Sequence, residues 1–207
     1  QKKIQIKRKG SRVAEALLKH RVHYFLKDEY KKLILNSNFL IISTLSEKYP
    51  DTSVKSGLKG FVKILNNKNI EWEDYDGNRM FRTVGNILKN KFVSILFLDL
   101  NNPENKDRPN TPVKLRLLGQ AKYVFSKKKI RVKIDFAFSN CPRYLPNYKF
   151  ISDSKFLKRL ITPEWKKRSY IKKILWFIEI IYLISILDQF KIFFTINFKI
   201  KSVQTLI

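Results

Sequence analysis

Apolar and polar residues alternate differently in three parts of the chain. Over residues 11–36 apolar residues recur at helical spacing, interrupted near Lys27 and Asp28, and Ser11 is placed to cap the first turn. From Phe39 onward the apolar runs become short and are bounded by turn residues, which is typical of buried strands. The pattern therefore predicts two N-terminal helices followed by a sheet.

The expected strands are short apolar runs separated by turn residues. They cover residues 39–45, 51–55, 61–65, 70–72, 92–100, 113–124 and 130–138. Gly57 and Gly60 predict a bend or a close approach of backbones before the third strand. One short helix is expected over residues 80–89. Antiparallel strands at this spacing indicate a barrel or a sandwich, and hence a mainly β fold with flanking helices (α+β).

The end of the chain has a different pattern. Thr162 and Pro163 predict the start of a helix that reaches Leu175. The apolar residues that follow, as far as Leu187, are interrupted by Glu179 and are too few for a transmembrane span of about 20 residues. The tail has three interpretations: a segment in contact with a membrane, a helix that packs on a partner, or sequence that selection has not shaped, which we favour. The expected parts are an N-terminal helical arm (1–36), a β domain (37–160) and a C-terminal helix with an apolar tail (161–207).

Positive charge dominates the composition. The chain has 43 Lys and Arg residues and 17 Asp and Glu residues, which gives a net charge of +26 and a pI of about 10.1. Such an excess attracts polyanions, so a basic nucleic-acid-binding barrel is one hypothesis. The positive residues are spread along the whole chain beside abundant Asn, Ile, Phe and Tyr, as a bias toward AT-rich codons would produce. We favour this bias, and nucleic acid is not the expected partner.

Few residues are available for side-chain catalysis or metal binding. Cys141 is the only cysteine, which excludes intramolecular disulfides and agrees with a reducing compartment. The basic residues 1–9 lack the apolar core of a secretory signal, so a cytoplasmic location is expected. His20 and His23 are the only histidines, and no carboxylate cluster accompanies them, so we expect neither a metal site nor a Ser-His-Asp triad. Nucleotide-binding, zinc and hydrolase motifs are also missing from the sequence, and redox chemistry would have to come from a cofactor.

The segment Asp74–Asn86 carries a combination of residues suited to an anion. Asp-Gly-Asn at 76–78 favours a turn, because glycine accepts positive φ and Asp and Asn side chains bond to nearby backbone. Arg79, Arg82 and Thr83 follow at or near the N-terminal turn of the predicted helix. Free N–H groups, guanidiniums and a hydroxyl at a helix start bind phosphate well. The alternative is a solvated turn with scattered arginines.

The same segment, Asp74-Tyr-Asp-Gly-Asn-Arg-Met-Phe-Arg-Thr-Val-Gly-Asn-Ile-Leu, resembles the flavin-binding segment of the pyridoxamine 5′-phosphate oxidase-like family. Two further blocks agree in order: Gly57-Leu-Lys-Gly-Phe-Val-Lys-Ile-Leu65 upstream and Asn140-Cys-Pro-Arg-Tyr144 downstream. The similarity extends over residues 12–175. Members of this family are FMN-binding split β-barrels, and their flavin commonly lies at a homodimer interface. The resemblance therefore implies an antiparallel split barrel, FMN as cofactor and a homodimer.

The resemblance and the needs of FMN together give the candidate residues for the phosphate group. Arg82 and Thr83 match the family's phosphate-binding positions. Lys63, on the preceding strand, is a third candidate, and Arg79 is a further one. Each offers a positive charge or a hydroxyl to the phosphate oxygens.

The flavin ring has its own candidates. Backbone groups of residues 60–63 and the amide of Asn78 or Asn86 are expected along its edge. A positive charge beside the ring stabilises the reduced flavin, for which Lys114 or Arg116 is the candidate; the alternative is that both only face solvent. Arg143 is a candidate clamp for an anionic or planar ligand and could serve the partner's site.

The resemblance implies an FMN-binding flavoprotein that acts as an oxidoreductase on an unidentified small molecule. The chain lacks the Arg-x-His substrate element of true pyridoxamine-phosphate oxidases, so oxidation of vitamin B6 is not expected. Lys55 and Lys59 stand where relatives have neutral residues, and residues 101–112 form a longer loop than usual. The alternative from another class is a non-catalytic protein that binds flavin or another cofactor, since a fold alone does not fix activity.

Overall fold

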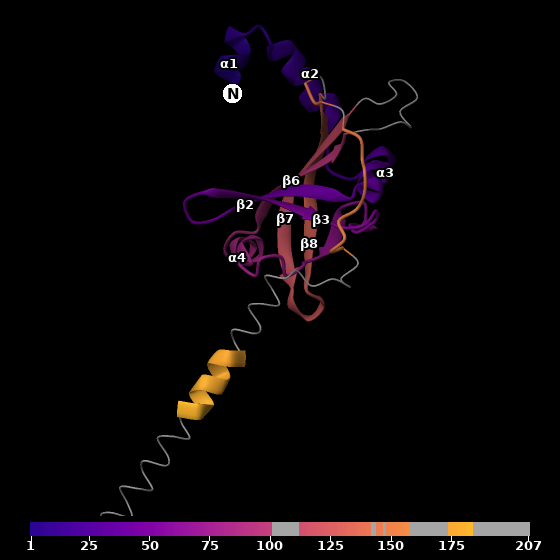
Figure 1. The fold of residues 1–207 in the computed structure, drawn as a ribbon. Coiled ribbons are helices and arrows are strands. Elements are labelled where there is room, and N and C mark those ends of the chain that lie inside the picture. Colours follow the sequence, from indigo (N-terminus) through magenta and orange to yellow (C-terminus); the bar gives the residue numbers. More distant parts are fainter. Residues whose placement is uncertain (101–111, 142–143, 147, 158–173, 184–207) are drawn as a thin grey trace, which may run out of the picture. The chain divides into compact units, whose positions relative to one another are not determined.

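The computed structural model describes residues 1–100, 112–141, 144–146, 148–157 and 174–183. The chain divides into two units, Gln1–Asp153 and Ser154–Ile207, and the first contains the sheet (Figure 1). Arg143 and nearly all of the predicted loop 101–112 and the predicted helix 163–175 lie outside the described residues. The predicted domain boundaries at residues 36 and 160 stay predictions.

The first unit is built on an eight-stranded antiparallel sheet. The strands are β1 (Val22–His23), β2 (Phe39–Leu45), β3 (Pro50–Ser56), β4 (Lys63–Asn66), β5 (Asn69–Glu73), β6 (Phe92–Asp99), β7 (Val113–Val124) and β8 (Lys129–Asn140). Their order is β3-β2-β6-β7-β8-β5-β4, with β1 paired to β8. The predicted strands are therefore confirmed, with small shifts at their ends. The third predicted strand begins at Lys63 and not at Phe61, because the N–H of Phe61 donates to the carbonyl of Leu58 in a turn.

Helices lie around this sheet. They are α1 (Lys2–Lys7), α2 (Ser11–Arg21), α3 (Asp28–Asn36), α4 (Arg82–Lys89) and the short 3-10 helix η1 (Phe125–Lys127). Helix α4 contacts β2 and β7, beside which it is seen in Figure 1. The arrangement is the predicted mainly β fold with flanking helices.

Two expectations about the N-terminal helices are wrong. Gly10, not Ser11, holds the N-cap position of α2, and no side-chain cap bond is found there among the described residues. The first helix ends at Arg21 and not near Lys27, because Val22–His23 pairs with Phe138 and Ala137 of β8 instead of continuing the helix. A strand partner more than a hundred residues away is not visible in the local pattern.

The core lies on the inner face of the central strands. Alternate residues of β2, β6 and β7 are buried, among them Leu40, Ile95 and Leu117, as a sheet with one covered face requires. Helix α3 adds Leu33 and Ile34 to this core. Strand β3 differs, since none of its residues is fully buried and its less exposed face is polar. That polar face lines the candidate site described below.

The predicted bend at Gly57 and Gly60 is confirmed. Gly60 has a φ of +77°, a conformation that side-chain-bearing residues rarely adopt. At Gly57, a Cβ atom would collide with the side chain of Phe61, so only glycine fits without rearrangement. The two glycines turn the chain between β3 and β4.

The second unit contributes one described helix, over residues 174–183. Its large side chains are exposed, including Trp176 and Phe177. Within the described part of the chain, no helix has the length and apolar character needed to cross a membrane.

Candidate functional site

A cavity of about 220 Å³ lies between β3 and the segment that leads into α4. Its lining residues come from these two elements: Asp51, Thr52, Ser53, Lys55, Asp74, Tyr75, Asp76, Gly77, Asn78, Met80, Phe81, Arg82, Thr83 and Val84. Asp51, Ser53 and Lys55 alternate along β3 and form its less exposed face. An edge strand and a helix N-terminus therefore make the two walls.

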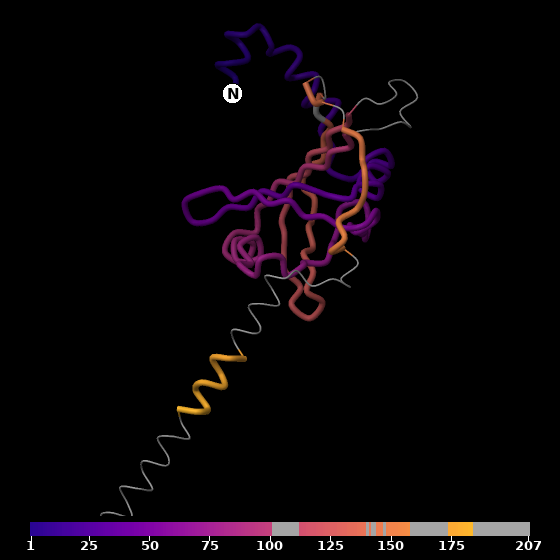
Figure 2. The backbone as a smooth tube through the Cα atoms, in the orientation of Figure 1, coloured from indigo at the N-terminus to yellow at the C-terminus, as the bar shows by residue number. Residues whose placement is uncertain are grey.

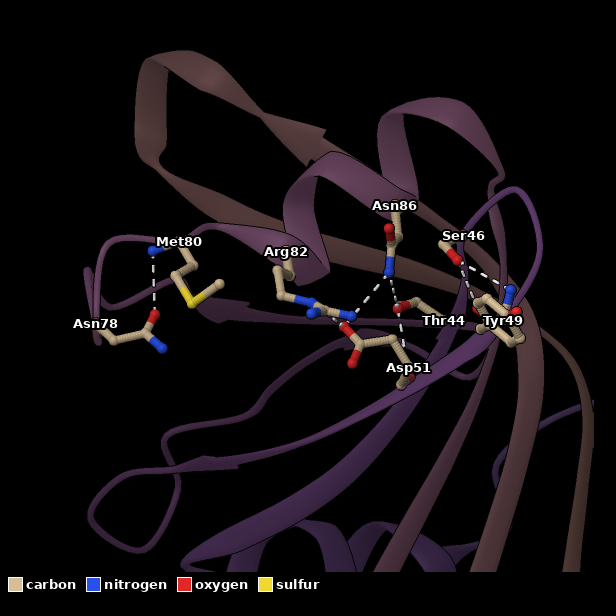
Figure 3. Close-up of polar contacts among 8 residues, drawn as sticks. All are labelled: Thr44, Ser46, Tyr49, Asp51, Asn78, Met80, Arg82 and Asn86. Carbon is tan, nitrogen blue, oxygen red and sulfur yellow. Dashed lines mark hydrogen bonds and ion pairs between the residues drawn. The ribbon is translucent and has the colours of Figure 1, made fainter.

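The turn that leads into α4 is held by short local hydrogen bonds. The N–H of Arg79 donates to the carbonyl of Asp76 over 2.7 Å, and Gly77 between them has a φ of +40°. The N–H of Met80 donates to the side-chain oxygen of Asn78 over 3.0 Å (Figure 3). Asn78 therefore acts as the predicted turn residue, and its side chain is committed to the backbone at this wall.

Helix α4 begins at Arg82, two residues later than expected from the sequence. Arg79 and Phe81 have φ values of 64° and 50°, and this left-handed backbone prevents the helix from starting at Met80. Phe81 takes the N-cap position and, as far as the chain is described, no side chain caps the helix there. A helix start whose first N–H groups have no side-chain cap can bind an anion.

Arg82 projects from this first turn toward β3. Its Nε atom lies 3.4 Å from Oδ2 of Asp51, and the Arg82 side chain is 60% exposed (Figure 3). Asn86, one turn later, donates from Nδ2 to Oγ1 of Thr44 over 3.0 Å and to Oδ2 of Asp51 over 3.4 Å. Asp51 thus accepts from two α4 side chains at once.

The β2–β3 hairpin fixes the position of Asp51. Ser46 Oγ donates to the carbonyl of Tyr49 over 2.7 Å and accepts the Tyr49 N–H over 3.1 Å, which closes the turn (Figure 3). In the resulting register Asp51 stands directly opposite Thr44. This register explains why Asn86 reaches both residues.

A second ion pair crosses the cavity at Lys55 and Asp74. Lys55 Nζ lies 3.9 Å from Oδ1 of Asp74, and the two side chains are 22% and 4% exposed. Burial lowers the pKa of Lys55, against the opposing attraction of Asp74 and Asp51. Burial also raises the pKa of Asp74, and Lys55 only partly offsets this. At 3.9 Å the pair lacks a hydrogen bond, so its attraction does not compensate for lost hydration.

The structure brings some of the sequence-predicted site residues together. Asn78, Arg82 and Thr83 line the cavity, and Thr83 is buried. Asn86 lies next to the cavity through its bond to Asp51. Arg79 lies in the adjacent turn, where its Nε atom is 3.9 Å from Asp76.

The other predicted residues lie elsewhere. Lys63 is exposed on β4, and Lys114 and Arg116 lie on β7; none of the three lines the cavity. The guanidinium of Arg116 stands 5.7 Å from the ring of Phe138, a contact that accounts for its position without a ligand. Their roles at a flavin stay predictions.

Sequence reasoning missed the strand side of the cavity. These residues, Asp51, Ser53 and Lys55, lie on the predicted strand 51–55, and the sequence indicates no binding role for Asp51 or Ser53. The available signal was that this strand carries polar residues on both faces, because a polar face has to meet water or another polar element.

The described residues contain no group of three or more His, Cys, Asp or Glu side chains placed to hold a metal ion. Cys141 is exposed.

An antiparallel sheet with flanking helices, and a polar cavity at the start of the helix beside it, define a split-barrel domain. The chain belongs to the pyridoxamine 5′-phosphate oxidase family, whose model matches residues 26–155, more than half of the chain. The resemblance seen in the sequence is therefore confirmed. A comparison with curated proteins gave no match.

A comparison with solved structures found matches of low sequence identity. A variant of HupZ from Group A Streptococcus is 19% identical, and the match covers 55% of this chain and 98% of that one, with a TM-score of 0.40. A candidate pyridoxamine 5′-phosphate oxidase from Lactobacillus delbrueckii is 17% identical over 56% and 95% of the two chains, with a TM-score of 0.41. An FAD-binding protein from Mycobacterium smegmatis is 13% identical over 56% and 99%, with a TM-score of 0.38. Membership of the family rests on the family model.

Proposed function

We propose that the chain binds FMN and uses it for the oxidation or reduction of a small molecule. The observation that carries this proposal is the cavity at the N-terminus of α4, in a chain of the pyridoxamine 5′-phosphate oxidase family. Arg82, Thr83 and the first N–H groups of the helix stand on one wall of this cavity, and Lys55 stands on the other. This is the donor set that a phosphate ester requires.

The residues fit the phosphate end of FMN better than its ring. A cavity of about 220 Å³ is smaller than the roughly 300–1,000 Å³ that drug-sized ligands occupy. We place the phosphate and the neighbouring sugar chain there, with the ring extending out of the cavity. A second copy of the chain then completes the ring site, which accounts for the proposed homodimer.

The protein's own groups bind and orient the cofactor in this proposal. Arg82 neutralises phosphate charge, and the buried Thr83 together with the helix N-terminus fixes the phosphate in place. When bound, FMN supplies the capacity to accept and return a hydride, which the side chains of the chain lack. The substrate would lie against the exposed face of the ring.

Absorbance spectroscopy on the purified protein tests the proposal. We expect a yellow protein, or a colourless one that takes up added FMN and shifts the flavin bands. A preparation that is colourless and leaves the spectrum of added FMN unchanged would contradict the proposal.

The Arg82→Ala variant tests the phosphate assignment. It removes the guanidinium at the start of α4, and charged hydrogen bonds contribute about 1.5–3 kcal/mol, so the Kd for FMN should rise at least about tenfold. Isothermal titration calorimetry with apoprotein measures this change. Lys89→Ala is the control, because Lys89 lies on the same helix but pairs with Glu47 outside the cavity. Equal Kd values for Arg82→Ala and Lys89→Ala would show that the phosphate binds at another position.

Turnover separates an enzyme from a non-catalytic flavin binder. Bleaching of the bound flavin by NADH or NADPH, followed by recovery with an electron acceptor, supports an oxidoreductase. Bound flavin that never cycles with any donor supports the binder.

A further inference from the structure

Two cations line the cavity in the described part of the chain. Each of them faces a carboxylate on the opposite wall. Arg82 of α4 faces Asp51 of β3, and Lys55 of β3 faces Asp74 at the start of the turn. Asp76 is a further carboxylate in the lining, so acidic residues outnumber basic ones there. A phosphate entering this cavity therefore meets cations that are already in contact with acidic groups.

Asp51 binds two side chains of α4. Its Oδ2 atom accepts from Arg82 Nε and from Asn86 Nδ2, both over 3.4 Å. These two donors belong to the first and second turns of one helix, α4. The carboxylate thus holds the helix in the manner of a ligand anion.

The hydrogen bonds of Asp51 to α4 are weak enough for a ligand to replace them. Both are long for charged hydrogen bonds, which are commonly about 2.7–2.9 Å. The Arg82 side chain is 60% exposed, so water and ions reach the pair and weaken it. A pair of this kind contributes about 0.2–1 kcal/mol, little enough for a bound phosphate to replace it.

We propose that the carboxylate of Asp51 occupies, next to Arg82, the position that the phosphate group of a bound phosphate ester takes. The ligand then binds by displacing this carboxylate. This inference rests on the proposed function, in which the ligand is FMN. Asp51 thereby sets the affinity of the site. Asp51 lowers the affinity for the phosphate ester, because Arg82 has to break its contact with Asp51 and because the charge of Asp51 repels the phosphate.

The Asp51→Asn variant tests the exchange, with FMN and riboflavin as the two probes. Asparagine keeps the size of the side chain and removes the competing charge. Calorimetry should show FMN binding about threefold to tenfold more tightly than to the wild-type protein, from the lost pair and the lost repulsion. Riboflavin has no phosphate, and its Kd should stay unchanged.

Glu47→Gln is the matched control. Glu47 lies in the β2–β3 turn and pairs with Lys89 of α4 over 2.6 Å, so its loss changes the net charge equally without touching the cavity. Its Kd for FMN should stay within about twofold of the wild type. Asp51→Ser serves as a second variant without the charge, should the asparagine variant not fold.

The outcomes separate this inference from the proposed function. Tighter binding of FMN alone supports the exchange. Unchanged or weaker FMN binding in the Asp51 variants overturns it while the flavin function stands, as does an equal gain for riboflavin or in Glu47→Gln. A wild-type protein that binds neither flavin overturns the proposed function and this inference together.

Discussion

At the scale of single residues, the Lys55–Asp74 pair is the least favourable feature of the site. Both side chains are mostly removed from water, and burial shifts each pKa toward the neutral form. Removing one member of such a pair leaves the other charge buried alone, whereas removing both leaves no charge to desolvate. The pair therefore costs stability at a position where both residues line the cavity.

A double-mutant cycle of Lys55→Met and Asp74→Asn tests this interpretation. Each single variant should lose about 1–2 kcal/mol of unfolding free energy, because it isolates the remaining polar partner. The double variant should be at least as stable as the wild type at pH 7. Urea unfolding measures all four proteins, and a double variant less stable than both single variants would contradict the prediction.

The same proteins give a prediction about pH. The pKa of Asp74 is raised in the folded state, so the folded protein holds this proton more tightly than the unfolded chain. The contribution of Asp74 to the stability of the wild type is therefore lost as pH rises from about 4 through the raised pKa. The double variant lacks this loss, and its stability relative to the wild type should increase over the same interval. Urea midpoints between about pH 4 and pH 7 check the sign.

At the scale of elements, the long β7–β8 hairpin lies in the interior of the sheet order (Figure 2). Its register shifts between Leu118 and Gly119, so that Gly119 stands opposite Ile134 and the pair bends there. A Cβ atom at Gly119 would collide with the backbone carbonyl of Lys133. The bend thus depends on a residue without a side chain.

Gly119→Ala should destabilise the protein by about 1–3 kcal/mol, because backbone rather than a flexible side chain would have to move. Gly85→Ala is the matched control: Gly85 is exposed on α4, and a Cβ there meets no atom within 4 Å. Alanine favours a helix over glycine by about 0.5–1 kcal/mol, so this variant should be more stable. Thermal unfolding compares the two, and shifts of the same sign would refute the account.

At the scale of the whole molecule, the net charge of +26 is the main electrostatic property. Few of the described cations have close acidic partners, because acidic residues are much rarer in the chain. Excess charge of one sign destabilises a compact state through repulsion, and salt screens that repulsion over about 10 Å at 0.1 M.

Raising NaCl from about 0.02 M to about 0.5 M should therefore raise the urea midpoint of unfolding. Chloride is used in preference to sulfate, because sulfate resembles the proposed ligand and would stabilise the folded state by binding. A midpoint that falls with NaCl would show that attractive pairs, such as Glu47–Lys89, outweigh the repulsion.

The sequence predicted the elements well because their signals are local. The apolar runs predicted both ends of β2 and β7 correctly, and Gly57 and Gly60 predicted the bend. Strand period and glycine conformation depend on neighbouring residues. The predicted start of α4 was two residues too early, because a left-handed backbone is uncommon at a bulky residue such as Phe81 and the pattern does not predict it.

Buried charge shows the limit of such local signals. Glu71 lies in β5 between the buried residues Ile70 and Trp72, yet it is itself buried. It accepts from Lys129 over 2.7 Å and from Arg131 over 2.8 Å. These hydrogen bonds hold the pKa of Glu71 below its usual value. Its partners come from β8, about sixty positions further along the chain, and only the strand order brings them together.

By itself, the sequence determined the seven longer strands, the turn at residues 76–78 and the family, but neither α1 nor β1. The periodicity of side chains and the turn chemistry that decide these are written in adjacent residues. Only the tertiary structure decided that Asp51 meets Arg82, 31 positions away, and that Lys55 meets Asp74 across the cavity. The reason is that a charge acts through space, and the neighbours of a charge are set by the register of the sheet and the placement of α4 upon it.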